Sequence, residues 1–333
     1  MASPVNPSPG EMLKPVALRS GDLVAVVAPA GPVRERALTG GIRVLENQGL
    51  RVRVGRHVGE RRGYLAGPDE ARAEDLNEAL TDPDVRAVFC ARGGYGCGRV
   101  LGLVDFAAPR ADPKVFVGYS DVTALHLAFA REAGLVTFHG PGVESLGEKL
   151  TRFTLDCLMK AVTLTEPLDV LPVPDDYPVP RVVSAGRASG PLAGGNLSLV
   201  ASLLGTPYAL EARGRVLLLE DVGEQPYRVD RMLTQLALSG KLSQAAGIVL
   251  GEMVDCEAPK PEDAPGLDPG EPPASLSLDD VVADHLSGLG IPVLSGLPCG
   301  HGRDKWTVPL GLATTVDGYR ARVILEEAAC GER

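Results

Sequence analysis

The chain has 333 residues, of which 44% are hydrophobic and 23% charged, and its formal net charge is -10. This length exceeds what one ordinary hydrophobic core holds, so we expect two domains. Basic residues form no cluster, which argues against nucleic-acid binding, and no apolar run reaches the roughly 20 residues of a membrane span.

The N-terminal segment and the cysteines bear on where the protein works. Residues 1–15 are rich in proline and lack a basic start and an apolar stretch, so they are predicted to form a flexible tail and not a secretory signal. The six cysteines are scattered and form no CxxC pair, which favours reduced thiols. We therefore expect a cytoplasmic protein.

Strands and helices alternate through the first half of the chain. Apolar runs that end in turn residues predict the strands, and helical spacing of apolar residues predicts the helices. The strands are expected at 21–31, 51–58, 84–96 and 114–121, and the helices at 33–49 and 68–80. This alternation predicts an α/β domain with a parallel sheet covered on both faces. In such domains the functional residues lie at the carboxyl ends of the strands.

A change of composition separates the two halves. Residues 166–185 are dense in proline and are predicted to link a domain at 16–165 to a second one at 186–333. The second half is expected to contain a glycine turn and helix at 188–205, strands at 215–222 and 245–253, helices at 226–240 and 276–290, and a hairpin at 306–327. The acidic, proline-rich stretch 256–275 is predicted to be a flexible loop, either a lid or, as we favour, an inert insertion.

Ser120 stands at a strand-to-helix turn in the segment KVFVGYSDV. A serine there is exposed above the sheet, and the N–H groups that open the helix can stabilise an oxyanion. The segment resembles the G-x-S-x-G elbow of serine hydrolases but lacks its second glycine. The structural alternative is that Ser120 or Asp121 caps the helix.

A serine nucleophile needs a base and a carboxylate that orients the base. His301 lies between two glycines in a loop that can carry an imidazole over a neighbouring site, although it is equally placed to be a turn residue. His139 ends an apolar strand before a glycine-proline turn. Glu220 closes the apolar strand VLLL, with Asp221 next to it, and is the candidate carboxylate.

Five segments in order resemble the LD-carboxypeptidases, a serine peptidase family that includes the microcin C immunity peptidases. They are ARGGYG, KVFVGYSDVTAL, GPLAGGNLSLVASLLGT, VLLLEDV with PYRVDRMLTQL, and GHGRDKWTVPLG, and the resemblance runs from Val24 to Val323. It implies a flavodoxin-like parallel-sheet N-terminal domain and a β-rich α+β C-terminal domain, with the site between them. It also implies a homodimer without a metal or other cofactor.

The resemblance also implies the site residues and the substrate. The implied set is a triad of Ser120, His301 and Glu220, and an oxyanion hole from the N–H groups of Asp121 and Gly94, which we prefer to Gly93. In the main branch of the family the substrate is a cytosolic murein tetrapeptide, cut before its terminal D-amino acid during peptidoglycan recycling. The substrate carboxylate needs a cation, for which Arg92 and Arg303 are candidates; the alternatives are a sheet-end ion pair for Arg92 and solvent exposure for Arg303.

Other functions fit less well. An immunity peptidase that cleaves a peptidyl-adenylate and an inactive peptide-binding module remain alternatives. A dinucleotide site needs G-x-G-x-x-G after the first strand, where the chain has APAGPVRE. A metal hydrolase needs ordered ligands, and Cys299 with His301 is the one close Cys/His pair. Cys97 or Cys299 could be a cysteine nucleophile, but each is explained more simply as a small apolar residue that fills space in the core.

Overall fold

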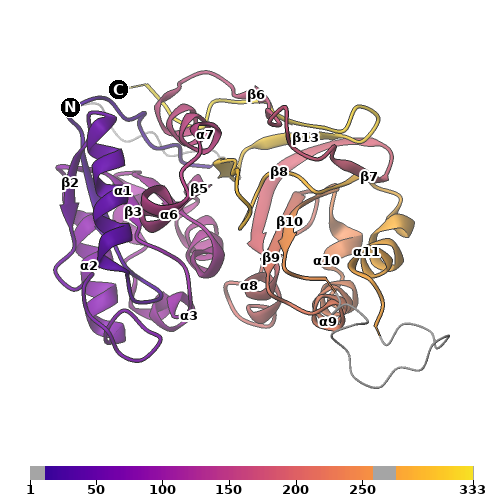
Figure 1. Ribbon diagram of the computed structural model, residues 1–333, viewed down its shortest axis with the longest axis horizontal. Coiled ribbons are helices and arrows are strands. Elements are labelled where there is room, and N and C mark those ends of the chain that lie inside the picture. Colours follow the sequence, from indigo (N-terminus) through magenta and orange to yellow (C-terminus); the bar gives the residue numbers. More distant parts are fainter. Residues whose placement is uncertain (1–11, 258–274, 333) are drawn as a thin grey trace.

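The computed structural model describes residues 12–257 and 275–332 and contains two sheets, one organised by each half of the chain (Figure 1). The first sheet has the order β12-β5-β4-β3-β1-β2, and its strands β1 to β5 are parallel. The order β2-β1-β3-β4-β5 is that of flavodoxin-like folds, so the predicted fold class is confirmed. These strands are β1 (Leu23–Val27), β2 (Arg51–Val54), β3 (Val85–Cys90), β4 (Val115–Gly118) and β5 (Thr137–His139).

Helices cover both faces of the first sheet, as continuous apolar strands require. Apolar residues of α1, α6 and α7 pack on one face, and those of α2 and α5 pack on the other. The helices of this half are α1 (Glu35–Asn47), α2 (Asp69–Thr81), α3 (Cys97–Val100), α4 (Ala107–Ala111), α5 (Thr123–Ala128), α6 (Val143–Glu148) and α7 (Arg152–Thr163). The helices predicted at 33–49 and 68–80 are α1 and α2.

The second sheet has the order β6-β14-β13-β8-β9-β10-β11-β7. Its strands β8 to β11 are parallel, and the strands on either side of them are antiparallel. The strands are β6 (Asp169–Val170), β7 (Arg181–Ser184), β8 (Arg187–Asn196), β9 (Val216–Val222), β10 (Gly247–Val254), β11 (Val293–Ser295), β13 (Ala313–Asp317) and β14 (Arg322–Leu325). The helices are α8 (Leu197–Ser202), α9 (Pro226–Leu238), α10 (Lys241–Gln244) and α11 (Leu278–Leu286).

Three segments differ from their sequence-based interpretation. Residues 166–185, predicted to be a linker, form the edge strands β6 and β7. In 188–205 the chain stays extended through Asn196 before α8 begins, and Gly195 (φ 134°) serves close approach, since a Cβ there would lie 2.5 Å from Thr123 Oγ1 of α5. The hairpin in 306–327 is confirmed as β13 and β14, but its first residues form β12 (Val308–Leu310), which pairs antiparallel with β5 of the first sheet.

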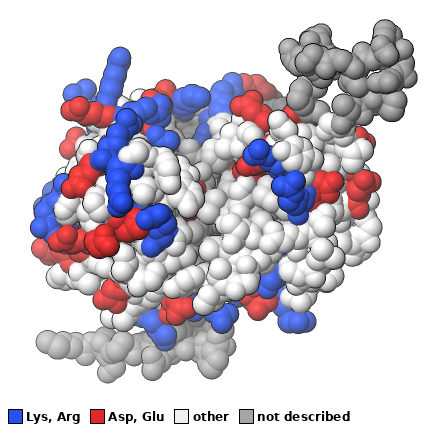
Figure 2. All heavy atoms as spheres, turned by 90° about the horizontal axis from the view of Figure 1, so that it is seen from below, with Lys and Arg blue, Asp and Glu red and all other residues white. Residues whose placement is uncertain are grey.

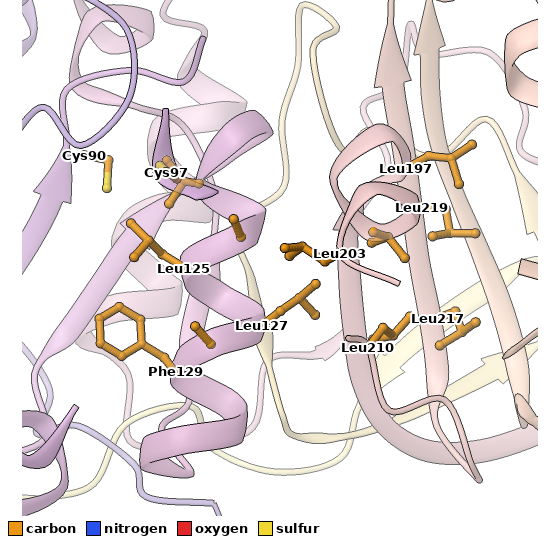
Figure 3. Packing of buried hydrophobic residues seen from close by; sticks show 14 of the residues in the cluster. Cys90, Cys97, Leu125, Leu127, Phe129, Leu197, Leu203, Leu210, Leu217 and Leu219 are labelled. Atoms are coloured by element: carbon orange, nitrogen blue, oxygen red, sulfur yellow. The ribbon is translucent and has the colours of Figure 1, made fainter. Parts of the chain in front are cut away.

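One hydrophobic core runs from the first sheet to the second. It includes Leu125 and Leu127 of α5 together with Leu203 and Leu217 from the second half, all of them buried. Figure 3 shows Leu127 directed across the junction toward Leu203. The two halves are therefore joined by apolar packing as well as by the chain, and the exact domain limits stay a prediction.

Part of the predicted tail is packed against the body of the protein. Leu13 N–H donates to Gly134 O at 2.6 Å, and Gly331 N–H donates to Pro15 O at 2.8 Å. Residues 1–11 of the predicted tail and 258–274 of the predicted loop lie outside the described residues. Across the two described ranges, no helix combines the length and the apolar character needed to cross a bilayer.

Charges of both signs share the surface. On the face shown in Figure 2, Lys and Arg side chains lie next to Asp and Glu side chains. Pairs of this kind include Arg56 with Glu74 and Glu78, and Arg99 with Asp69. Exposed pairs contribute about 0–1 kcal/mol each to stability, so these pairs add little to it.

Candidate active site

Ser120 occupies a strained turn at the carboxyl end of β4. Its φ is 61°, a left-handed value that disfavours every residue with a side chain, and it starts a short 3-10 turn that leads into α5. The half-buried Ser120 therefore stands on a sharp strand-to-helix turn. This is the backbone geometry that exposes the nucleophile of serine hydrolases.

Asp121 ties this turn to the glycine-rich loop. Its Oδ2 accepts a hydrogen bond of 2.7 Å from the N–H of Cys97, the first residue of α3. Burial raises the pKa of Asp121. Neither Ser120 nor Asp121 caps the helix, because Tyr119 occupies the N-cap of the turn and no side chain caps it or α5. The capping interpretation is therefore wrong.

Gly93 and Gly94 border Ser120 in the loop between β3 and α3. A Cβ on Gly93 would lie 2.7 Å from Ser120 Cβ and 2.9 Å from Ser120 Oγ, so a side chain does not fit. Gly94 has φ 115°, which favours glycine. No backbone hydrogen bond in the described part of the chain uses the N–H of Gly93, Gly94 or Asp121. These donors can therefore serve a developing oxyanion.

We expect Gly93→Ala to lower kcat at least about a hundredfold, which is the scale of losing one oxyanion contact. The added methyl group would displace Ser120 Oγ and the adjoining peptide. Steady-state hydrolysis of the substrate proposed below measures the loss. Gly98→Ala is the matched control, since a Cβ at Gly98 meets nothing within 4 Å. Equal activity of Gly93→Ala and wild type would contradict the prediction.

Glu220 and His301 meet at the carboxyl end of β9. Glu220 Oε2 accepts a hydrogen bond of 2.7 Å from His301 Nδ1, and the Glu220 side chain is 0% exposed. Burial raises the pKa of Glu220, but contacts with His139 and His301 outweigh it and bring this pKa to about 2. Glu220 is therefore ionised at neutral pH and fixes the tautomer of His301, with Nε2 as the acceptor.

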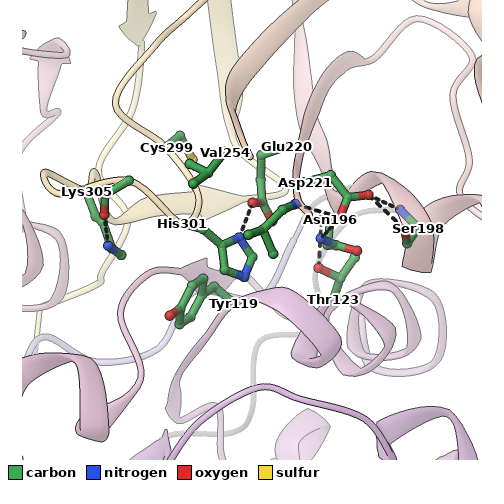
Figure 4. Close-up of polar contacts among 12 residues, drawn as sticks. Tyr119, Thr123, Asn196, Ser198, Glu220, Asp221, Val254, Cys299, His301 and Lys305 are labelled. Carbon is green, nitrogen blue, oxygen red and sulfur yellow. Dashed lines mark hydrogen bonds and ion pairs between the residues drawn. The ribbon is translucent and has the colours of Figure 1, made fainter. Parts of the chain in front are cut away.

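Tyr119 connects this pair to the serine turn. Its ring lies beside the imidazole of His301, with centroids 4.9 Å apart, and Figure 4 shows His301 between Glu220 and Tyr119. Ser120 is the residue after Tyr119. Within the described ranges its Oγ forms no hydrogen bond with His301 Nε2. Such bonds are often long or misaligned in the absence of substrate. The structure thus places the three predicted residues around one interface, with the Glu220–His301 bond already formed.

Asp221, the neighbour of Glu220, has a different task. Its Oδ1 accepts from Asn196 Nδ2 at 2.9 Å, and its Oδ2 accepts from the N–H and the hydroxyl of Ser198, both at 2.8 Å. Asn196 N–H in turn donates to Thr123 Oγ1 of α5 at 2.9 Å. Asp221 therefore holds the start of α8 and the contact between the halves, and does not contact an imidazole.

The two predicted substrate-binding arginines both have protein partners. Arg92 Nη1 donates to Pro32 O at 3.3 Å and lies 3.8 Å from Glu144 Oε2. The Arg303 side chain is 64% exposed and is paired with Asp176 at 2.8 Å and with Asp304 at 2.7 Å. The carboxylate near Arg92 belongs to α6 and not to a strand end, and Arg303 is exposed but also ion-paired. The substrate-binding roles of both stay predictions.

Sequence reasoning missed Lys305 and the place of His139. Lys305 is buried beside the loop of His301, and its Nζ donates to Gly302 O. Burial lowers the pKa of Lys305. Its position four residues after His301 was the available signal. His139 was visible at a strand end, but its contact with Glu220 depends on tertiary packing.

His126 is a second buried histidine, on α5. Its Nε2 lies 2.8 Å from Gly118 O and its Nδ1 lies 2.9 Å from Thr137 Oγ1. Burial lowers its pKa to about 3. Between this pH and the ordinary histidine value of about 6.5 the unfolded chain binds the proton more tightly, so stability is lost as pH falls through this window.

We expect the free energy of unfolding to fall by at most about 1.4 kcal/mol per pH unit in this window because of His126. His126→Gln removes the titrating group and should make the pH dependence shallower by that slope. Urea unfolding at several pH values between 6.5 and 4 measures both slopes. Parallel curves for wild type and variant would contradict the assignment.

Comparison with known proteins bears directly on this site. The LD-carboxypeptidase N-terminal domain matches residues 24–140, and the LD-carboxypeptidase C-terminal domain matches residues 189–316. The probable murein peptide carboxypeptidase of Bacillus subtilis (strain 168) is 39% identical, over 94% of this chain and 94% of that protein. The crystal structure of muramoyltetrapeptide carboxypeptidase from Oxalobacter formigenes has a TM-score of 0.76 at 33% identity, over 91% of this chain and 97% of that one.

A further relative is named for a different function. The microcin C7 self-immunity protein MccF of Escherichia coli is 26% identical, over 90% of this chain and 91% of that protein. The structure of MccF in its wild-type apo state has a TM-score of 0.85 at 24% identity, over 96% of this chain and 100% of that one. That structural likeness shows a shared fold.

Proposed function

The chain belongs to the LD-carboxypeptidase family, and on that basis we propose that it is a serine carboxypeptidase acting on murein tetrapeptide. It would hydrolyse the amide bond between an L-residue and the terminal D-amino acid. The observation that carries the proposal is the 2.7 Å bond between buried Glu220 and His301, formed beside the strained turn of Ser120.

The reaction follows from the positions of these groups. Ser120 Oγ attacks the scissile carbonyl carbon while His301 Nε2 takes the hydroxyl proton. The N–H groups of Gly94 and Asp121 stabilise the oxyanion, and His301 then protonates the departing amine of the D-amino acid. Water attacks the acyl-enzyme, gives a proton to His301 and releases the shortened peptide, and the proton returns to Ser120. Glu220 stays ionised throughout.

The terminal carboxylate of the substrate requires a cation, and of the two candidate arginines we favour Arg92. Arg92 directly precedes Gly93, its side chain is 35% exposed, and its carboxylate contact at 3.8 Å is long. Arg303 already has two close carboxylates. We also propose that the protein acts in the cytoplasm on recycled murein peptides, as a homodimer without a metal or other cofactor.

Mass spectrometry of a tetrapeptide with an L-D terminal bond tests the proposal. The wild-type protein should release the terminal D-amino acid and leave a tripeptide, while the same peptide with a terminal L-residue stays intact. Ser120→Ala should leave both peptides intact. Full activity of that variant would refute the mechanism, and an intact L-D peptide with wild type would refute the substrate.

The similarity to MccF keeps a second substrate class in view. MccF has been solved in complex with aspartyl sulfamoyl adenosine, an amino acid linked to a nucleoside through a sulfamoyl group. If the protein cleaves a peptidyl-adenylate and leaves the tetrapeptide intact, the immunity-peptidase function replaces the recycling function. If folded protein cuts neither substrate and Ser120 does not react with a fluorophosphonate, the chain is a peptide-binding module.

A further inference from the structure

The second carboxylate oxygen of Glu220 has no hydrogen bond within the described residues. Oε2 is bonded to His301, but Oε1 is buried and lies 3.6 Å from His139 Nε2, which is a candidate donor. His139 Nε2 is also buried and equally lacks a hydrogen bond in the described chain. Burying a charged oxygen without a donor is costly, so two unsatisfied atoms facing each other require an explanation.

The other nitrogen of His139 lies next to a thiol. Nδ1 lies 3.6 Å from the Sγ of Cys299, within the range of a sulfur hydrogen bond. Burial raises the pKa of Cys299 well above its ordinary value, so the thiol keeps its proton. An ionised carboxylate can only accept, so the imidazole proton resides on Nε2, which faces Glu220 Oε1, and Nδ1 is left to accept from the thiol.

The titratable groups near His139 come from several different parts of the chain. Glu220 comes from β9 and Cys299 from the loop after β11, while the rings of Tyr119 and His126 have centroids 6.4 Å and 6.2 Å from that of His139. Glu220 is the one carboxylate in this set. The His139 side chain is 1% exposed, so water does not compete for its N–H.

We propose that His139 is a positioning residue that holds Glu220 in place for His301, a role that rests on the proposed function. The 3.6 Å contact becomes an ordinary hydrogen bond of about 2.9 Å after a shift of about 0.7 Å. With an imidazole N–H on each oxygen, the carboxylate cannot rotate away from His301 Nδ1. Glu220 also stays ionised when His301 takes up the proton of Ser120.

The test compares His139→Leu, which removes the donor, with His139→Gln, whose amide N–H reaches toward the same carboxylate. The readout is the rate at which Ser120 reacts with a fluorophosphonate between pH 5 and pH 9. His139→Leu should react about ten- to a hundredfold more slowly, and the acid limb of its pH profile should move to higher pH. Without the second donor, Glu220 holds its own proton and the proton of His301 more tightly, and both effects act in that direction. His139→Gln should recover most of the rate and the wild-type acid limb.

The outcomes separate this proposal from the proposed function. If wild-type protein reacts with the probe but cuts no tetrapeptide, the substrate is wrong and the role of His139 is judged from the probe alone. A wild-type rate in His139→Leu overturns the proposal. If either variant reacts more slowly but its acid limb has not moved, the proposal is also overturned. A merely structural residue would lower the amount of folded protein without shifting that limb. Thermal melting shows whether each variant is folded. If His139→Leu is unfolded, the decision rests on folded His139→Gln: a slow reaction with an unmoved acid limb overturns the proposal, and wild-type behaviour supports it.

Discussion

Ser120→Ala is expected to lower kcat on the L-D tetrapeptide by about a millionfold, the scale found when a triad serine is removed. The nearest hydroxyls along the chain are engaged elsewhere, that of Tyr119 with Ser145 Oγ at 3.0 Å and that of Thr123 with the N–H of Asn196 at 2.9 Å, so we expect neither to replace Ser120. Release of the terminal D-amino acid, followed over long incubations at high protein concentration, measures the loss. Activity within tenfold of wild type would contradict Ser120 as the nucleophile.

Ser120→Gly tests the origin of the strain at the same position. It should be as inactive as Ser120→Ala but more stable than either wild type or the alanine variant, by about 1 kcal/mol, because glycine accepts a φ of 61° without steric cost. Chemical denaturation of the three proteins measures the difference. Equal stability of the glycine and alanine variants would show that the turn is not strained.

Glu220→Gln is expected to lower kcat by about ten thousandfold while leaving the fold intact. The amide has the shape of the carboxylate, but it does not stabilise the imidazolium, and its NH₂ group can hold His301 in the wrong tautomer. The loss should appear in kcat more than in KM, because Glu220 is fully buried behind His301. Steady-state kinetics with the tetrapeptide gives both constants.

Asp221→Asn is the matched control for that experiment. Asp221 is also a buried carboxylate at the end of β9, but it bonds Asn196 and Ser198 and not a histidine. Its loss should lower the melting temperature and leave kcat within a few fold of wild type. A similar drop in kcat for both variants would mean that general destabilisation, and not orientation of His301, explains the effect of Glu220→Gln.

Local patterns in the sequence predict most of the first sheet. Apolar strands such as Val115–Gly118 are long enough, and bounded clearly enough, to define a buried parallel sheet without knowledge of their neighbours. The positions of Ser120 and Glu220 at strand ends follow from the same pattern. The prediction that the two act together needed five ordered motifs and a family resemblance, since each residue alone could be explained structurally from the sequence.

Interactions between distant segments account for what the sequence did not predict. Gly195 looked like a turn residue, yet it is glycine because Thr123 of α5 packs against it. The proline-rich segment 166–185 forms edge strands, where proline at the flanks is tolerated because an edge leaves N–H groups unpaired. The contact of His139 with Glu220 joins β5 to β9 across the two halves and has no local signal.

The loop of His301 is anchored in both sheets, because β11 before it belongs to the second sheet and β12 after it belongs to the first. A sliding displacement of one sheet against the other would therefore pull directly on the imidazole, while Ser120 would travel with the first sheet and Glu220 with the second. We therefore expect catalysis to depend on the relative position of the two sheets. Activity would be lost at displacements too small to expose the shared core.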